Sequence, residues 1–153
     1  MNNECIFCQI VKGNIKTAKI WENQNFLAIL DVNPNTKGMT LVMPKKHYDS
    51  YAFDLNDNLY SRLLLAAKKV AKILEKTLKV KRVAMVMEGV GINHTHIKLY
   101  PLYGIDKKFK EIWAKKRKYF KNYQGYISTQ LGPPASPSVL EKLAKKIKSK
   151  TNS

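Results

Sequence analysis

The sequence contains no apolar run that approaches the roughly 20 residues needed to cross a bilayer. Its first residues, Met-Asn-Asn-Glu-Cys, also lack the basic and then apolar pattern of a signal peptide. We therefore expect a cytoplasmic protein with reduced thiols and no membrane partner. The length of 153 residues favours one domain with a core of ordinary size, and a hydrophobic content of 44% is typical of a globular chain.

Acidic residues are scarce, because 11 Asp and Glu stand against 28 Lys and Arg and give a formal charge of +17. The excess is concentrated in residues 105–153, where thirteen Lys and Arg and three Asp and Glu give a net charge of +10. A positive field attracts polyanions and steers anionic ligands. A solvated, Lys-rich surface without a partner explains the same composition equally well.

Hydrophobic periodicity predicts a short helix, three strands, a long helix and two further strands. The short helix covers residues 5–12 and ends at Gly13, and the long helix covers residues 55–78, where apolar residues recur at helical spacing. The predicted strands cover residues 18–22, 26–32, 39–44, 82–87 and 94–100, the last being stopped by Pro101. Short connections favour antiparallel pairing, so we predict an α+β domain, an antiparallel sheet of about five strands with the long helix on one face.

The basic residues 105–153 are predicted to form a helical C-terminal extension, packed on or near a first domain of residues 1–104. Two basic helices are expected in the extension, over residues 107–120 and 137–148. Residues 131–136 between them are too rich in Gly and Pro for regular structure.

Two of the three histidines, His94 and His96, precede Lys98 in one segment that we expect to be extended. Residues two apart on a strand point to the same face, so these three side chains would share one face. An imidazole titrates near neutrality and can attack phosphorus or shuttle a proton, and an ammonium beside it stabilises phosphate oxygens in the transition state. A surface strand with alternating polar residues explains the His-x-His motif as well, and for this motif alone it is the simpler interpretation.

The sequence has only two cysteines, Cys5 and Cys8, and their spacing fits a redox pair, half of a metal site or two small buried residues. A redox pair usually opens a helix after a strand, and no strand is predicted before this one. A closed zinc site takes four ligands from cysteine and histidine. His47 and His94 would complete such a site and leave only His96 over, but this assignment is a hypothesis because the two halves are far apart in the chain.

Four separated motifs occur within residues 4–103. They are Cys-Ile-Phe-Cys-Gln-Ile, Phe-Leu-Ala-Ile-Leu-Asp-Val-Asn-Pro, Gly-Met-Thr-Leu-Val-Met-Pro-Lys-Lys-His and His-Thr-His-Ile-Lys-Leu-Tyr-Pro. In this order they closely resemble the histidine-triad (HIT) superfamily, nearest to its nucleotide-binding branch with zinc-carrying bacterial members. The resemblance implies a HIT-like fold, and a homodimer paired through the long helix and the adjacent strand. It also implies a nucleotidyl hydrolase or transferase that cleaves at the α-phosphate of a purine nucleotide or dinucleotide derivative.

The resemblance further implies roles for individual residues. His96 would be the nucleophile that takes the nucleotidyl group, and Lys98 stands at the position of the third histidine. The cofactor would be a structural zinc ion, and its implied ligands are Cys5, Cys8, His47 and His94. Asp31 would bond the ribose hydroxyls, within a base and ribose pocket formed by Phe7, Ile10, Ile15, Ile29 and Val32.

This sequence departs from the family pattern on the phosphate side. Lys98 replaces the third histidine, Met39 replaces a histidine after Gly38, and Gly89-Val90-Gly91 replaces a Gly-Gln-Ser run. An ammonium can hold a phosphate oxygen, but it shuttles protons poorly at neutral pH. The alternative prediction is therefore a catalytically weakened or inactive nucleotide- or RNA-binding module, with nucleic acid bound through the basic C-terminal region.

Overall fold

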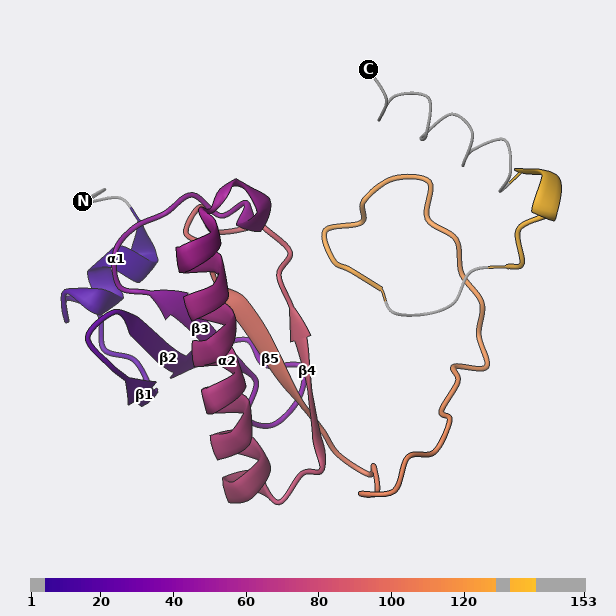
Figure 1. Ribbon diagram of the computed structural model, residues 1–153, viewed down its shortest axis with the longest axis horizontal. Helices are drawn as coiled ribbons and strands as arrows, with labels where there is room; N and C mark the ends of the chain where they lie inside the picture. The colour runs from indigo at the N-terminus through magenta and orange to yellow at the C-terminus, as the bar shows by residue number, and fades with distance from the viewer. Residues whose placement is uncertain (1–4, 129–132, 140–153) are drawn as a thin grey trace. The chain divides into compact units, whose positions relative to one another are not determined.

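The computed structural model describes residues 5–128 and 133–139 (Figure 1). Its contacts divide the chain into two compact units, Met1–Phe109 and Lys110–Ser153. The first unit contains the sheet and the helices α1 (Ile6–Val11) and α2 (Asp57–Leu78), with a short 3-10 helix, η1 (Ala52–Asp54), before α2. No helix in the part of the chain that the structure describes is both long and apolar enough to span a membrane.

Five strands form one sheet in the order β1-β2-β3-β5-β4. The strands are β1 (Lys19–Glu22), β2 (Phe26–Leu30), β3 (Thr40–Pro44), β4 (Arg82–Val86) and β5 (Ile97–Leu102). Every neighbouring pair is antiparallel, and Lys98 of β5 lies opposite both Leu41 of β3 and Val86 of β4. The predicted α+β fold with a five-stranded antiparallel sheet is confirmed.

The long helix α2 covers one face of the sheet (Figure 1). It begins where the side chain of Asn56 accepts a hydrogen bond from the backbone N–H of Leu59 at 3.0 Å, which satisfies one of the free amides at the helix start. Its apolar stripe packs against the side chains of alternate strand residues. The buried cluster beneath it includes Phe26, Ala28, Val42, Leu63, Val70, Ile97 and Leu99.

The helix α1 packs on the opposite face of the sheet, over β2 and β3. Because strand side chains alternate, Leu27, Ile29, Leu41 and Met43 point away from α2 and form a second buried cluster with Phe7 and the two cysteines. Lys98 lies between Ile97 and Leu99, which both face α2, so the alternation directs its side chain to the α1 side. The predicted site residues are therefore gathered on the face that α2 leaves uncovered.

The last strand was predicted at residues 94–100, and this prediction is wrong at both ends. Strand β5 begins at Ile97, so His94 and His96 lie in the loop before it, and Pro101 lies inside it, opposite Val83 of β4. The ladder with β3 ends at Leu99. The carbonyl of Pro101 accepts a hydrogen bond from Thr36 Oγ1 at 3.1 Å on that side, so the amide hydrogen that proline lacks is not needed by the ladder.

The helix predicted over residues 107–120 is wrong. These residues have no regular secondary structure. Nearly all of them are exposed, so no apolar stripe is buried that could stabilise a helix. Lys115 and Lys118, three residues apart, would also repel each other on one face of such a helix. In the second predicted helix, residues 137–139 are helical and residues 140–148 lie outside the described residues. Packing of the extension on or near residues 1–104 stays a prediction.

Candidate metal centre and adjoining cavity

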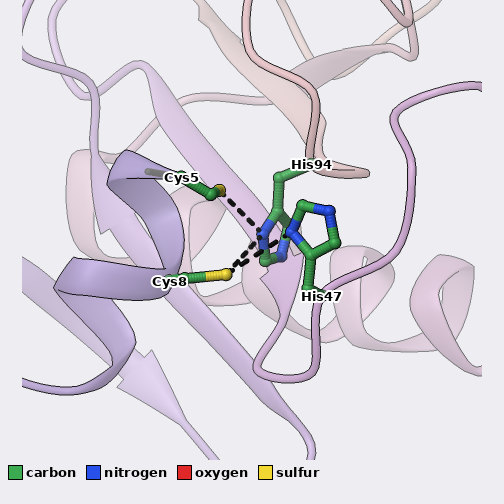
Figure 2. A group of neighbouring side chains, drawn as sticks. All are labelled: Cys5, Cys8, His47 and His94. Carbon is green, nitrogen blue, oxygen red and sulfur yellow. Dashed lines mark hydrogen bonds between the residues drawn. The ribbon is translucent and has the colours of Figure 1, made fainter. Parts of the chain in front are cut away.

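Two thiols and two imidazoles converge at the start of α1 (Figure 2). Cys5 is the N-cap of α1 and Cys8 lies three residues later, so the helical turn brings both sulfurs to one side. His47 comes from the loop after β3 and His94 from the loop before β5. The four donor atoms lie within 4.8 Å of one another. These are the four residues that the sequence analysis combined into one hypothetical metal site.

The distances between the sulfur and nitrogen atoms fit a metal ion with tetrahedral coordination. Cys5 Sγ lies 3.5 Å from His94 Nδ1, and Cys8 Sγ lies 3.4 Å from His47 Nδ1 and 3.7 Å from His94 Nδ1. With Zn–S of about 2.3 Å and Zn–N of about 2.05 Å, tetrahedral sulfur and nitrogen ligands are about 3.6 Å apart. Two sulfurs and two nitrogens are also one of the usual donor sets of closed zinc sites.

The outer nitrogens of both rings have partners that leave Nδ1 to face the sulfurs. His94 Nε2 donates to the carbonyl oxygen of Pro44 at 2.9 Å, so Nδ1 is the nitrogen with the lone pair. His47 Nε2 lies 3.7 Å from a carboxylate oxygen of Asp49. Partners of this kind fix the ring orientation of metal-binding histidines.

Hydrogen bonds between the two histidine loops hold His47 and His94 side by side. The backbone N–H of Thr95 donates to the carbonyl of Tyr48 at 2.9 Å, and the Thr95 hydroxyl donates to the carbonyl of Asp49. Asn93 Nδ2 donates to Asp49 Oδ1 at 2.9 Å. These contacts join segments more than 40 residues apart, which sequence spacing could not reveal.

Burial affects the protonation of His94 and Cys8. His94 is fully buried, and burial lowers its pKa, with His47 and His96 lowering it further, so the ring is neutral and able to bind a metal at neutral pH. Burial and the neighbouring Cys5 raise the pKa of the Cys8 thiol. A bound divalent cation reverses this preference, because a coordinating thiol is deprotonated outright. The residues present therefore fit a zinc ion.

A cavity of about 420 Å³ adjoins the cysteine and histidine group. Phe7 joins the two, because its ring makes edge contacts with both His94 and His96, at centroid distances of 5.7 Å and 5.2 Å, and also lines the cavity. A volume of this order is typical of small-ligand sites, in which apolar walls carry a few polar groups.

The structure brings all the remaining predicted site residues to this cavity. His96 and Lys98 line it, and so do the six residues predicted for the base and ribose, Phe7, Ile10, Ile15, Ile29, Asp31 and Val32. Val32 is 84% exposed and lies at the rim. One carboxylate oxygen of Asp31 accepts the backbone N–H of Asn33 at 2.8 Å, which orients the side chain.

His96 is held in a defined tautomer. Its Nδ1 donates to the carbonyl oxygen of His94 at 2.7 Å, so Nε2 is the nitrogen with the lone pair. Burial lowers the pKa of His96, and the charge of Lys98 adds to this effect. A neutral imidazole with an available nitrogen on a cavity wall can act as a nucleophile.

Sequence reasoning missed Glu88, which is paired with Lys98. Lys98 Nζ donates to Glu88 Oε2 at 2.7 Å, and the Glu88 side chain is only 9% exposed. Val86, the last residue of β4, lies opposite Lys98, and Glu88 follows it by two residues, just beyond the strand. The pairing register would have revealed this contact, but the long loop between the two strands conceals the register in a single sequence.

Comparison with protein families gives a match to the HIT domain over residues 12–103. The chain is similar to an uncharacterized HIT-like protein of Methanocaldococcus jannaschii, at 34% identity over 115 residues that span 71% of this chain and 88% of that protein. It is also similar to the adenosine 5′-monophosphoramidase hnt1 of Schizosaccharomyces pombe, at 43% identity over 70 residues, 46% of this chain and 52% of that protein.

A solved structure with a similar fold is that of SMU.412c from Streptococcus mutans UA159. The TM-score is 0.71 at 27% sequence identity, and the match covers 99% of this chain and 87% of that one. The similarity extends the agreement from the sequence to the arrangement of the sheet and helices.

Proposed function

The chain belongs to the HIT domain family, and from this premise we propose that it is a nucleotidyl hydrolase or transferase that acts on a purine nucleoside phosphate derivative through His96. The observation that carries the proposal is the tautomer of His96, whose Nδ1 is bonded to the His94 carbonyl while the ring lines the cavity. The yeast relative described as a monophosphoramidase supports an adenosine phosphate derivative as substrate class. Replacement of His96 tests the proposal, because it should abolish turnover.

The reaction takes two displacements at the α-phosphorus. In the first, His96 Nε2 forms a bond to phosphorus as the bond to the leaving group breaks, and the electron pair departs with the leaving group. In the second, water or another acceptor forms a bond to phosphorus and the P–N bond breaks. This returns the imidazole with its lone pair, and the proton of the acceptor is released to solvent. Lys98 would hold a phosphate oxygen, and its charge would oppose the negative charge that develops.

We propose that Cys5, Cys8, His47 and His94 hold a structural zinc ion. When bound, the ion supplies a rigid four-way link between α1 and the two histidine loops, and it takes no part in the displacement. Both cysteines are free thiols, and a thiol site of this kind fits the reducing cytoplasm that we propose as its location.

Replacing Asp31 with alanine is expected to weaken nucleoside monophosphate binding by about 10- to 100-fold, since hydrogen bonds to a charged group contribute about 1.5–3 kcal/mol. Asp31 is half-buried, lines the cavity and has its carboxylate oriented by Asn33. Calorimetric titration with AMP and with its 2′- and 3′-deoxy analogues measures the effect.

The control for Asp31→Ala is the difference in affinity between AMP and the deoxy analogues, measured for wild type and for the variant. Wild type should lose affinity for the deoxy analogue that lacks the contacted hydroxyl, whereas Asp31→Ala should bind AMP and that analogue equally. If the variant still prefers AMP as strongly as wild type does, Asp31 does not bind the ribose.

We further propose a homodimer formed through α2 and the outer edge of β4. Strand β4 is at one end of the sheet, and Met85 on it is 51% exposed. Because Met85 lies opposite Leu99, which packs under α2, its side chain is on the helix side of this edge. Light scattering should give twice the chain mass of 17.6 kDa, and Met85→Lys should shift it toward the monomer through like-charge repulsion. A wild-type monomer at all concentrations would exclude the dimer.

A second candidate function, single-stranded RNA binding, is favoured by the composition of residues 107–128. Exposed aromatic side chains alternate with cations there, and Trp113 and Tyr119 are 65% and 75% exposed. Bases stack on such rings while cations contact phosphates. The four cations of residues 115–118 predict a log–log salt slope of about −3 for the association constant, measured by fluorescence polarisation with a short single-stranded RNA.

The control for RNA binding removes the same charge elsewhere. Replacing residues 115–118 with glutamine should abolish most of the salt dependence. Replacing Lys68, Lys69, Lys72 and Lys76 of α2 with glutamine should leave most of it intact. Equal losses in both variants would indicate a general charge effect, and salt-insensitive binding would exclude this function.

A further inference from the structure

Lys98 is fixed at the wall of the cavity beside His96. It follows His96 by two residues, and both side chains line the cavity. Its Nζ donates to Glu88 Oε2 at 2.7 Å, and the two side chains are only 23% and 9% exposed. The ammonium is therefore held in one place and is not a solvated surface cation.

The ammonium of Lys98 is a poor proton donor at neutral pH. Burial by itself would lower the pKa of Lys98, but the hydrogen bond and the charge of Glu88 outweigh burial and raise the pKa. The ordinary value for lysine is already about 10.4. Among the described residues that line the cavity, His96 has the only imidazole and none has a thiol. The cavity thus offers a departing group positive charge but little proton donation, because His96 is the proposed nucleophile.

This combination discriminates between leaving groups. An amine or an alcohol leaves phosphorus readily only when a proton reaches it during bond cleavage, because its anion is strongly basic. A carboxylic or phosphoric acid leaves as a weakly basic anion that needs no proton. A fixed cation stabilises such an anion as its charge develops.

We propose that this site acts on acid anhydrides of a nucleoside monophosphate, with a carboxylic or phosphoric acid as the departing group, and discriminates against amine and alcohol derivatives. The inference rests on the proposed function, and it distinguishes this chain from its yeast relative, which is described as a phosphoramidase. Lys98 is then a catalytic residue that contacts the departing oxygen. Glu88 is a positioning residue that acts through Lys98.

The step balances without a general acid. His96 Nε2 bonds to phosphorus, the bond from phosphorus to the anhydride oxygen breaks, and the electron pair leaves with that oxygen as a carboxylate or phosphate anion beside the Lys98 ammonium. A water oxygen then bonds to phosphorus and the P–N bond breaks. One proton of that water is released to solvent, and the products are the nucleoside monophosphate and the free acid anion.

The test is a series of AMP derivatives with one nucleotidyl group and leaving groups of graded acidity. It comprises an acyl and a phosphoryl anhydride, aryl esters from 4-nitrophenyl to phenyl, and the unsubstituted phosphoramidate. We expect wild-type kcat/KM at neutral pH to be at least about 10²-fold lower for the phenyl ester and the phosphoramidate than for the 4-nitrophenyl ester, the least that a missing general acid usually costs. The two anhydrides should rank with the fastest esters.

Substitutions of Lys98 separate charge from proton donation. Lys98→His should narrow this gap by about tenfold or more, because an imidazole donates a proton at neutral pH. Lys98→Gln should lower all rates and leave the gap wide, and its amide can still bond Glu88. Lys16→Gln, which removes the same charge from another part of the cavity lining, should leave the gap unchanged.

Glu88 is tested by how kcat and KM divide the effect. Glu88→Gln should lower kcat for the 4-nitrophenyl ester more than it raises KM, and Glu88→Asp should restore part of the loss. Equal effects of both replacements on kcat would remove Glu88 from the proposal.

The outcomes distinguish this inference from the function on which it rests. Equal wild-type rates across the series, or an unchanged gap in Lys98→His, would overturn the inference and leave His96 as the nucleophile. If the wild type turned over no derivative and no nucleotidyl group became attached to His96, the proposed function itself would fail. Because the wild-type series and two replacements are compared, misfolding of one variant still leaves a decisive measurement.

Discussion

Replacing His96 with glycine is expected to lower kcat/KM for an activated AMP ester by at least about 10³-fold, since removal of a nucleophile typically costs this much or more. The tautomer set by the His94 carbonyl leaves the attacking nitrogen to His96, and it is the only imidazole among the described residues of the cavity lining. Single-turnover measurements with labelled AMP ester should show a covalent nucleotidyl adduct on wild type and none on the variant.

Added imidazole provides the control for this experiment. Glycine leaves a space beside Phe7, whose ring contacts that of His96 at a centroid distance of 5.2 Å. Free imidazole that enters this space should recover a measurable part of the turnover in His96→Gly, which requires a folded site. Turnover in the variant as fast as in wild type, without imidazole, would end the enzymatic proposal.

Removing zinc is expected to lower the melting temperature by about 10 °C or more. If free zinc is about 1,000 times its dissociation constant, binding adds about 4 kcal/mol of stability. For a domain of this size, 1 kcal/mol corresponds to a shift of about 2–8 °C. The ligands join α1 to two loops of the sheet, and three of the four are almost fully buried, so their loss leaves this region without its link. Scanning calorimetry with and without a chelator measures the change.

The matched variant for this prediction lacks the thiols. Cys5→Ser/Cys8→Ser should contain no zinc by elemental analysis, melt near the temperature of the chelated wild type and show no further response to chelator. One zinc per chain is the expected wild-type content. If the melting temperature of wild type is unchanged after its metal content has fallen to zero, zinc does not stabilise the fold.

Residues whose environment follows from local periodicity were predicted well. The alternation of Ile97, Lys98 and Leu99 correctly placed a charged side chain opposite two core residues, because the strand repeat is two and one face is buried. The expectation that Cys5 and His94 lie together was also correct. A chain with only two thiols and three imidazoles allows few sets of four such ligands.

Features that depend on distant pairing could not be predicted. Pro101 is typical of the end of a strand, but the ladder with β3 has already ended at Leu99, so no strand partner needs the amide hydrogen that proline lacks. Glu88 gave no signal, since its contact with Lys98 depends on the register of β4 against β5. The helix expected over residues 107–120 rested on composition, and these residues are largely exposed and have no regular secondary structure.

The shortness of α1 has a consequence for how this protein can change over generations. A helix of six residues is too short to persist in isolation. Its N-cap residue Cys5 and its residue Cys8 carry the two thiols. Phe7 and Ile10 of the same helix form part of the cavity wall. Substitutions in α1 therefore affect the metal ligands and the cavity wall together. We expect loss of the cysteines during evolution to alter the shape of the cavity and so the ligand that it binds. Conversely, evolutionary changes to the cavity residues of α1 must keep the two cysteines in place.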